Sequence, residues 1–205
     1  MRENYTSKDD KELWAELRNG NINAVEALYR KYYALLLNYG NKCTPNNEIV
    51  RDCIQELFVK LCNSKHISYT ESPRAYLLKS IRNLISDKQT SLTHKSEYLS
   101  FNDDVILSVF SDDGIDKNYD ESDEDIRMKQ SLIKALSQLS NTQKHILYLR
   151  YIKNLSHKEV ADVIGMSEQS SMNLLSRTLK KLREILSDHS ISMISFFIWI
   201  NSNID

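Results

Sequence analysis

The stretch EIVRDCIQELFVKLC, residues 48–62, carries the helical pattern that decides the fold class. Its apolar side chains recur every fourth residue, at Ile49, Cys53, Leu57 and Leu61. This period is typical of an amphipathic helix that buries one stripe. Pro45 and Asn46 break the chain just before it. We therefore predict a helix over residues 48–62 whose opposite face is polar.

Three more helical patterns surround this stretch in the N-terminal half: residues 9–18, 23–39 and 74–88. Asn23 and Glu26 resemble a capping box that begins the second of them, and Gly40 is expected to end it. Ser72 and Pro73 are typical of an N-cap followed by proline at the first helical position. Four Gly and two Pro in 205 residues provide too few turns for a barrel or sandwich. The predicted fold class is all-α.

A helix-turn-helix pattern occupies residues 156–186. Ser156 and Glu159 form the S-x-x-E signature of a capping box at its first helix. Gly165 supplies a permissive turn, and Ser167 caps a long last helix over residues 168–186. The expected starts of two preceding helices are residues 122–125 and Asn141.

Charge is segregated along the chain, although the formal net charge is only −1. Residues 1–95 carry 15 basic and 11 acidic residues, and residues 126–205 carry 11 basic and 6 acidic ones. Residues 96–125 carry one basic and 11 acidic residues, which indicates an extended, solvated connector. The predicted boundaries are a first helical domain at 1–95, an acidic linker at 96–123, a helix-turn-helix domain at 124–187 and a tail at 188–205.

The three cysteines have neither the spacing of a zinc site nor an even number for a disulfide framework: Cys43, Cys53 and Cys62. They are predicted to be reduced, structural thiols, and no metal or cofactor is expected. No apolar run reaches membrane-spanning length, so a cytoplasmic protein is expected. The sequence has no H-E-x-x-H, no G-x-S-x-G and no phosphate-binding glycine loop, so no enzyme activity is predicted.

The most apolar run, ISMISFFIWI at residues 191–200, follows the last predicted helix. Ten residues are too few to cross a bilayer, for which about 20 are needed. Left in water, the run would favour aggregation, so it must be covered. Its cover is either the chain's own helices or a partner protein.

Three separated blocks resemble conserved region 2 of bacterial sigma factors: AVEALYRKYY at 24–33, DCIQELF at 52–58 and AYLLKSIRNLISD at 75–87. The run LSNTQK at 139–144, with the helix-turn-helix after it, resembles region 4. The chain is thus similar to extracytoplasmic-function sigma factors, the minimal two-domain group of the sigma-70 family. The resemblance implies two small helical domains joined by a flexible linker, and a function in giving core RNA polymerase its promoter specificity.

The resemblance also implies sites in the first domain. The residues implied to bind the clamp of core RNA polymerase are Asp52, Gln55, Glu56 and Phe58. The first three share one polar helix face. A face of this kind is also typical of a helix that is simply exposed to solvent. The residues implied to bind melted promoter DNA are Tyr76, Lys79, Arg82, Asn83, Asp87 and Lys88. Tyr76, Lys79 and Asn83 follow one helical edge and combine a stacking ring, a cation and an amide, although Tyr76 would also suit a core.

In the second domain, the residues expected at duplex DNA are Lys158, Ser167, Gln169, Ser170, Met172, Asn173, Arg177, Lys180 and Lys181. The start of the last helix departs from the family pattern, because residues 170–174 contain no cation. Ser171 also replaces an expected apolar residue, while Leu174 is expected to face the core. Unaided reading of a minus-thirty-five element is therefore in question.

The implied partners are core RNA polymerase, at its beta-prime clamp and beta flap, promoter DNA, and an anti-sigma factor or recruiting protein. Two alternatives remain open at this stage. One is a sigma-like adaptor that another protein brings to DNA, which agrees with the cation-poor last helix. The other is a polymerase-independent helix-turn-helix regulator, which leaves the motifs at 52–58 and 82–87 unexplained.

Overall fold

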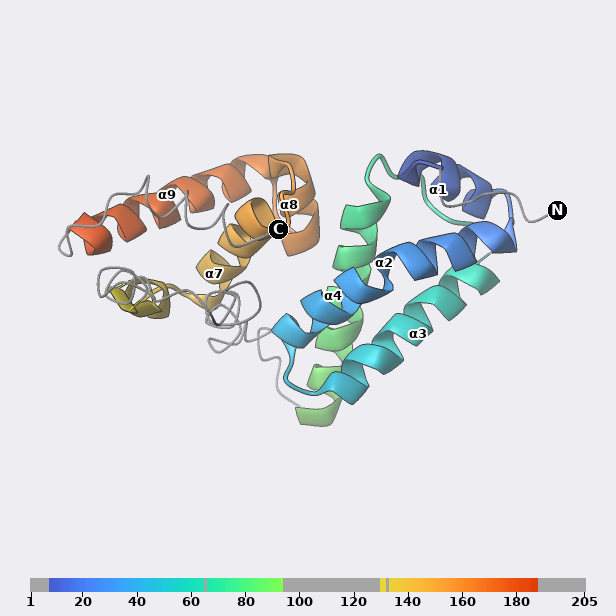
Figure 1. Ribbon diagram of the computed structural model, residues 1–205, viewed down its shortest axis with the longest axis horizontal. Coiled ribbons are helices and arrows are strands. Elements are labelled where there is room, and N and C mark those ends of the chain that lie inside the picture. Colours follow the sequence, from blue (N-terminus) through green and yellow to red (C-terminus); the bar gives the residue numbers. More distant parts are fainter. Residues whose placement is uncertain (1–7, 65, 94–129, 132, 188–205) are drawn as a thin grey trace, which may run out of the picture. The chain divides into compact units, whose positions relative to one another are not determined.

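The computed structural model describes residues 8–64, 66–93, 130–131 and 133–187 (Figure 1). All regular secondary structure in these ranges is helical, which confirms the predicted all-α class. The chain divides into two compact units. Helices α1 to α4 belong to the first, and the helices from residue 130 onward make up most of the second.

The first unit contains four helices: α1 (Asp10–Arg18), α2 (Ile22–Cys43), α3 (Asn47–Asn63) and α4 (Pro73–Thr93). Asp9 and Glu12 form a capping box at α1, and Asn46 accepts from the first backbone N–H groups of α3. The backbone N–H of Ala75 donates to the Ser72 hydroxyl at 3.2 Å, so the predicted cap of α4 is confirmed. The predicted cap of α2 is wrong by two residues, because Asn21 accepts from the N–H of Asn23.

The core of this unit is built from the apolar stripes of all four helices. Fully buried side chains include Trp14 of α1, Leu28 and Tyr39 of α2, Ile54 of α3 and Ile81 of α4. The α3 stripe is wider than predicted, because it also buries the following residues: Val50, Ile54 and Phe58. The prediction that Ile49 belongs to the buried stripe is wrong, because Ile49 is only half-buried. Burial of whole aliphatic and aromatic side chains is the main stabilising contribution, at roughly 1.5–3 kcal/mol each.

Gly40 lies inside α2, so the prediction that it ends this helix is wrong. The helix continues to Cys43, which is completely buried. A Cβ atom at Gly40 would clash with Cγ1 of Val50 and lie 3.3 Å from Cδ1 of Ile85. The glycine therefore permits close approach of α2 to both α3 and α4, and it does not act as a helix stop.

Gly40→Ala is expected to destabilise the full chain by up to about 2 kcal/mol, because overpacking costs about 1–3 kcal/mol and exceeds the gain of about 1 kcal/mol in helix propensity. In a Val50→Ala background the same substitution should instead stabilise, since the clashing methyl groups are gone. Urea unfolding of the four members of this cycle measures both values. Equal effects in the two backgrounds would contradict this account of Gly40.

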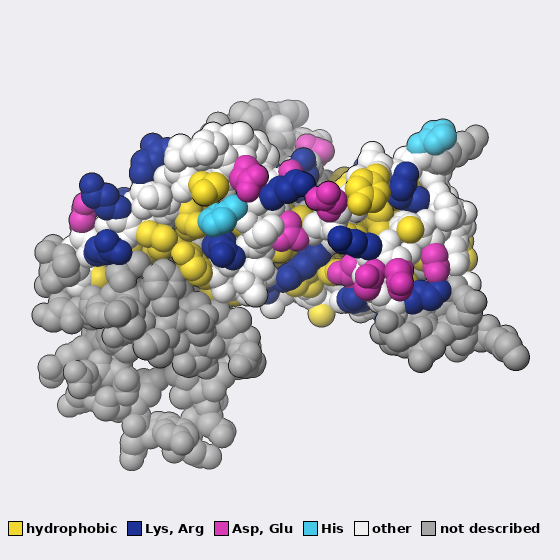
Figure 2. Space-filling view, turned by 90° about the horizontal axis from the view of Figure 1, so that it is seen from above, with side chains coloured by type: hydrophobic (Ala, Val, Ile, Leu, Met, Phe, Trp, Pro, Cys, Tyr) yellow, Lys and Arg dark blue, Asp and Glu magenta, His cyan; other side chains and the backbone are white. Residues whose placement is uncertain are grey.

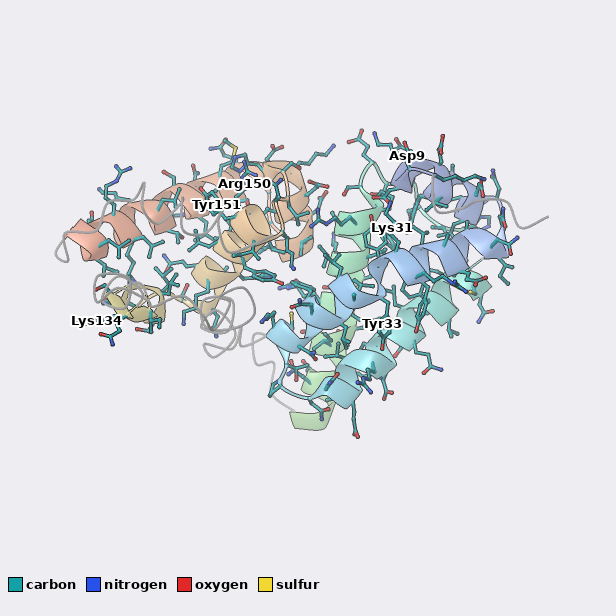
Figure 3. The ribbon with its side chains drawn as sticks, viewed as in Figure 1. Asp9, Lys31, Tyr33, Lys134, Arg150 and Tyr151 are labelled. Carbon is teal, nitrogen blue, oxygen red and sulfur yellow. The ribbon has the colours of Figure 1, made fainter. Side chains whose placement is uncertain are left out.

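From residue 130 onward, the described residues form helical segments at 130–131 and 133–137, α7 (Asn141–Leu147), a π-helical turn η2 (Tyr148–Ile152), α8 (His157–Ile164) and α9 (Glu168–Ser187). The capping residue of α7 is Ser140, which forms a capping box with Gln143, so the prediction of Asn141 is wrong by one position. The π-helical turn was not predicted. There Arg150 donates to the Leu155 carbonyl at 3.0 Å, and Figure 3 labels Arg150 beside Tyr151 on this turn.

The helix-turn-helix forms as predicted. The backbone N–H of Ser156 donates to the Glu159 carboxylate at 2.8 Å, and the Glu159 N–H donates to the Ser156 hydroxyl at 3.3 Å. Gly165 has a φ of 81°, a left-handed conformation that glycine adopts without strain. The N–H of Ser170 donates to the Ser167 hydroxyl at 3.2 Å and so caps α9.

The inner face of α9 contains an unusual polar position. Leu175 is buried, whereas Leu174 is only half-buried, so the expected core leucine is shifted by one residue. Ser171 is 1% exposed, and its hydroxyl has no hydrogen-bond partner. Ser171 therefore occupies a core position, as predicted. Its buried hydroxyl without a hydrogen bond is unfavourable for stability.

Three expectations lie outside the described residues: the acidic linker at 96–123, the helix start at 122–125 and the apolar tail at 188–205. Within the ranges that are described, no helix is long and apolar enough to cross a membrane.

Candidate functional site

The outer face of α3 presents polar side chains that the core does not need. Asp52 and Gln55 are exposed, and the Asp52 side chain retains 70% of its accessible surface. Glu56 is half-buried. The three side chains share one face because they are spaced i, i+3 and i+4 on the helix. The structure therefore brings them together as predicted, as an acidic and amide surface.

Lysines from two helices surround the carboxylates of this face. The Glu56 carboxylate accepts from Lys60 at 2.7 Å, and Lys60 is the first cause of the lowered pKa of Glu56. The ammonium of Lys88 on α4 lies 3.8 Å from Asp52 and 3.7 Å from Glu56. Sequence reasoning placed Lys88 with the DNA-facing residues and missed these pairs. Ion pairs that are partly exposed to solvent contribute little to stability, so this arrangement does not by itself explain the polar face.

Phe58, predicted at the polymerase surface, is in the core with 6% of its surface exposed. Its ring packs edge-on against Tyr29 of α2, with centroids 5.0 Å apart. Tyr29 also contacts Tyr33, which Figure 3 labels on α2, at 5.3 Å. Phe58 thus supports an aromatic cluster whose outer member, Tyr29, is 39% exposed. The run of tyrosines at 29–33 was the sequence signal for this cluster.

Along α4, Lys79, Asn83 and Asp87 are exposed on one edge, and Tyr76 is half-buried at its start. Trp14 of α1 holds Tyr76, because the two rings meet edge-on with centroids 4.8 Å apart. The indole N–H of Trp14 donates to the Ser68 carbonyl at 3.1 Å, which fixes the supporting ring. The predicted edge is therefore present, with an aromatic ring held from behind.

Arg82 departs from this edge. Its Nε atom is buried and has no hydrogen-bond partner, although the residue as a whole is half-buried. Its charge acts on the buried thiol of Cys43, whose pKa burial raises to about 12 despite a hydrogen bond from Tyr39 and the charge of Arg82. Arg82 therefore lies between the core and the edge and is not a fully exposed DNA contact.

On α9 an exposed stripe runs through Gln169, Met172, Asn173, Arg177 and Lys180. Ser167 and Ser170 at its start are also exposed, and their hydroxyls are hydrogen-bonded to each other at 2.8 Å. Figure 2 shows separate Lys and Arg side chains along the α9 side of the second unit. Lys158, on the preceding helix, is exposed as well.

Lys181 does not join this stripe. It is half-buried, and its ammonium donates to the backbone carbonyl of Gln138 at 2.5 Å. Gln138 directly follows helical residues 133–137, so Lys181 satisfies a carbonyl at a helix end. The structure thus gives this cation a packing contact inside the second unit.

Two family models match the chain, one in its N-terminal half and one in its C-terminal half. Sigma-70 region 2 matches residues 28–93, which include α3 and α4, and Sigma-70, region 4 matches residues 129–182, which include the helix-turn-helix. Together they span more than half of the chain. The chain belongs to the sigma-70 family. Its α3 face and α4 edge are therefore features of region 2, and its α9 stripe belongs to region 4.

The relatives that match most of the chain include an extracytoplasmic-function sigma factor. It is 25% identical over 163 residues to the ECF RNA polymerase sigma factor SigM of Bacillus subtilis (strain 168), covering 78% of this chain and 94% of SigM. It is 26% identical to the RNA polymerase sigma factor YlaC of the same organism, covering 78% and 91%. The fold is similar to that of CnrH, solved in complex with the cytosolic domain of CnrY, with a TM-score of 0.53, 18% identity and coverage of 87% and 97%.

The three cysteines of this sigma-70 family chain are free thiols. Cys43 and Cys53 are buried, and burial raises the pKa of both, whereas Cys62 at the end of α3 is exposed. In the part of the chain that is described, no group of three His, Cys, Asp or Glu side chains could hold a metal ion.

Removing either exposed cation of α9, by Arg177→Ala or Lys180→Ala, is expected to weaken duplex DNA binding equally for all sequences. Each change should lower the slope of log affinity against log salt by roughly 1, since phosphate contacts release counterions. Lys181→Ala is the internal comparison, because its ammonium is already bonded to Gln138 and its slope should change less. Anisotropy titrations over a salt series measure all three, and a base-specific loss at one position would contradict the phosphate role.

Proposed function

We propose that the chain directs transcription initiation by binding core RNA polymerase through the α3 face and opening promoter DNA with the α4 edge. The observation that carries this proposal is the exposed group of Asp52 and Gln55 on a helix whose other face is fully used in the core. A polar face without a packing role is available for a basic partner helix, and the beta-prime clamp of the polymerase is the proposed partner.

The α4 edge supports the second half of the proposal. Tyr76 provides a ring for stacking on an unpaired base, Lys79 a cation for phosphate and Asn83 an amide for a base edge. The contact with Trp14 limits the motion of the Tyr76 ring, so less entropy is lost when a base stacks on it. The second unit would hold duplex DNA through α9 and contact the beta flap.

The experiment is transcription in vitro from genomic DNA of the organism that encodes the chain, with core polymerase alone and with the full chain added. The proposal requires discrete new start sites that depend on the chain, together with its coelution with core polymerase. Failure to coelute, with retention of duplex DNA binding, would instead identify a polymerase-independent helix-turn-helix regulator.

A sigma-like adaptor is the second candidate, and the neutral start of α9 favours it. Residues 168–176 contain no Lys or Arg, so the base-facing part of the helix gains no help from charge. An adaptor would coelute with core polymerase and initiate on pre-melted templates, yet remain inactive on duplex promoters until a recruiting protein is added.

A regulatory protein partner is also proposed. CnrH, which has a similar fold, was solved with the cytosolic domain of CnrY bound. By analogy, an anti-sigma or recruiting protein would bind this chain in the cytoplasm. The function proposed for the chain is binding, without catalysis.

A further inference from the structure

The exposed stripe of α9 changes chemistry along its length. Gln169, Met172 and Asn173 lie in its first turns, whereas the first cation is Arg177. The recognition helix of a helix-turn-helix enters the major groove with its N-terminal residues on the base edges. The part of α9 that would face the bases therefore offers two amides and a thioether, and the part that would face the backbone offers cations.

The amide of Gln169 is hydrogen-bonded to a neighbour on the same helix. Its Nε2 donates to Oδ1 of Asn173 at 3.1 Å, one helical turn away. That bond uses one N–H of Gln169 and leaves its second N–H and its Oε1 for a ligand. Adenine presents an N6–H donor beside the N7 acceptor, which matches this donor and acceptor pair. Guanine presents two acceptors, O6 and N7, so Oε1 would face O6 with no hydrogen bond.

The neighbouring side chains suit the other base of an A·T pair. Because the Asn173 oxygen accepts from Gln169, Asn173 offers the N–H groups of Nδ2, which can donate to thymine O4. Met172 is 42% exposed and provides an apolar surface for the C5-methyl group of thymine. The commonest contact to guanine uses Arg or Lys, and residues 168–176 contain neither.

We infer that α9 selects A·T base pairs in the major groove, with Gln169 as the adenine-reading residue and Asn173 as the residue that positions it. The inference rests on the proposed function in taking duplex DNA as the ligand of the helix-turn-helix. It adds the identity of the bases. Arg177 and Lys180 supply affinity through phosphates, and the amide pair supplies the choice of sequence.

The test is selection from a pool of randomised duplexes by the full chain without polymerase, followed by sequencing of the retained DNA. The unchanged chain should enrich adenine over guanine roughly tenfold at one position or more. Gln169→Arg should shift that same position to guanine, because Arg pairs with O6 and N7. The matched control is Arg177→Ala, which should lower retention of all sequences alike.

Three outcomes would overturn the inference: guanine enrichment by the unchanged chain, equal retention of all sequences, or a Gln169→Arg variant that still prefers adenine. Gln169 is exposed, so its substitution should leave the fold intact, which circular dichroism verifies. The assay contains no polymerase. A chain that selects A·T pairs but does not assemble with core polymerase would therefore overturn the proposed function and leave this inference supported.

Discussion

The double variant Asp52→Lys, Gln55→Ala is expected to abolish assembly of the chain with core RNA polymerase. A cation placed where a carboxylate meets a basic helix costs several kcal/mol, which corresponds to a loss of affinity of at least about 100-fold. Both side chains are exposed on α3, so the variant should remain folded. Size-exclusion chromatography with core polymerase measures the loss, and circular dichroism with thermal unfolding verifies the fold.

Lys11→Glu is the matched control for this variant. Lys11 is exposed on α1, so the control also reverses one surface charge, but outside the α3 face. It should assemble with core polymerase as the unchanged chain does. Normal assembly by the α3 double variant would show that its polar face is only a solvated surface.

Asn83→Ala is expected to form the holoenzyme normally and to lose open complexes on duplex promoters by roughly tenfold or more. Its amide is exposed on the α4 edge, and a side chain that hydrogen-bonds a base contributes about 1–3 kcal/mol of discrimination. Permanganate footprinting of unpaired thymines measures the open complex. A template that is already melted should restore initiation, because the variant lacks only the contribution to strand separation.

The control here is Asn38→Ala, which removes the same amide from an exposed position of α2. It should support open complexes at the level of the unchanged chain. If Asn83→Ala is equally impaired on duplex and pre-melted templates, the role of the α4 edge in melting is wrong.

The sequence predicted the helices well and their ends less well. Spacing at intervals of three and four residues identified α3 and both helices of the helix-turn-helix, because one buried stripe imposes that period. Gly40 was misinterpreted because local propensity treats glycine as a helix stop, whereas contacts with Val50 and Ile85, distant in sequence or on other helices, decide its role. Tertiary packing of this kind cannot be read from neighbouring residues.

In the candidate site, too, exposed residues could be predicted from the sequence, whereas residues placed by tertiary contacts could not. Exposed residues such as Asp52, Asn83 and Gln169 could be selected from the family resemblance, and helical spacing also placed Asp52 and Asn83 on faces that the core does not need. Phe58 and Lys181 could not be placed from pattern alone. The first is buried against an aromatic ring of another helix, and the second reaches a carbonyl 43 residues away in sequence.

The unequal surroundings of the three thiols make the unmodified chain suitable for spectroscopy. Thiolate is the nucleophile toward maleimides, and Cys43, with a pKa of about 12, is almost entirely protonated at neutral pH. Cys53 is buried too, which leaves Cys62 as the accessible sulfur at the end of α3. Cys62 is seven residues beyond Gln55, two helical turns along the same face. A fluorophore attached there would report polymerase docking in real time, without removal of any native cysteine.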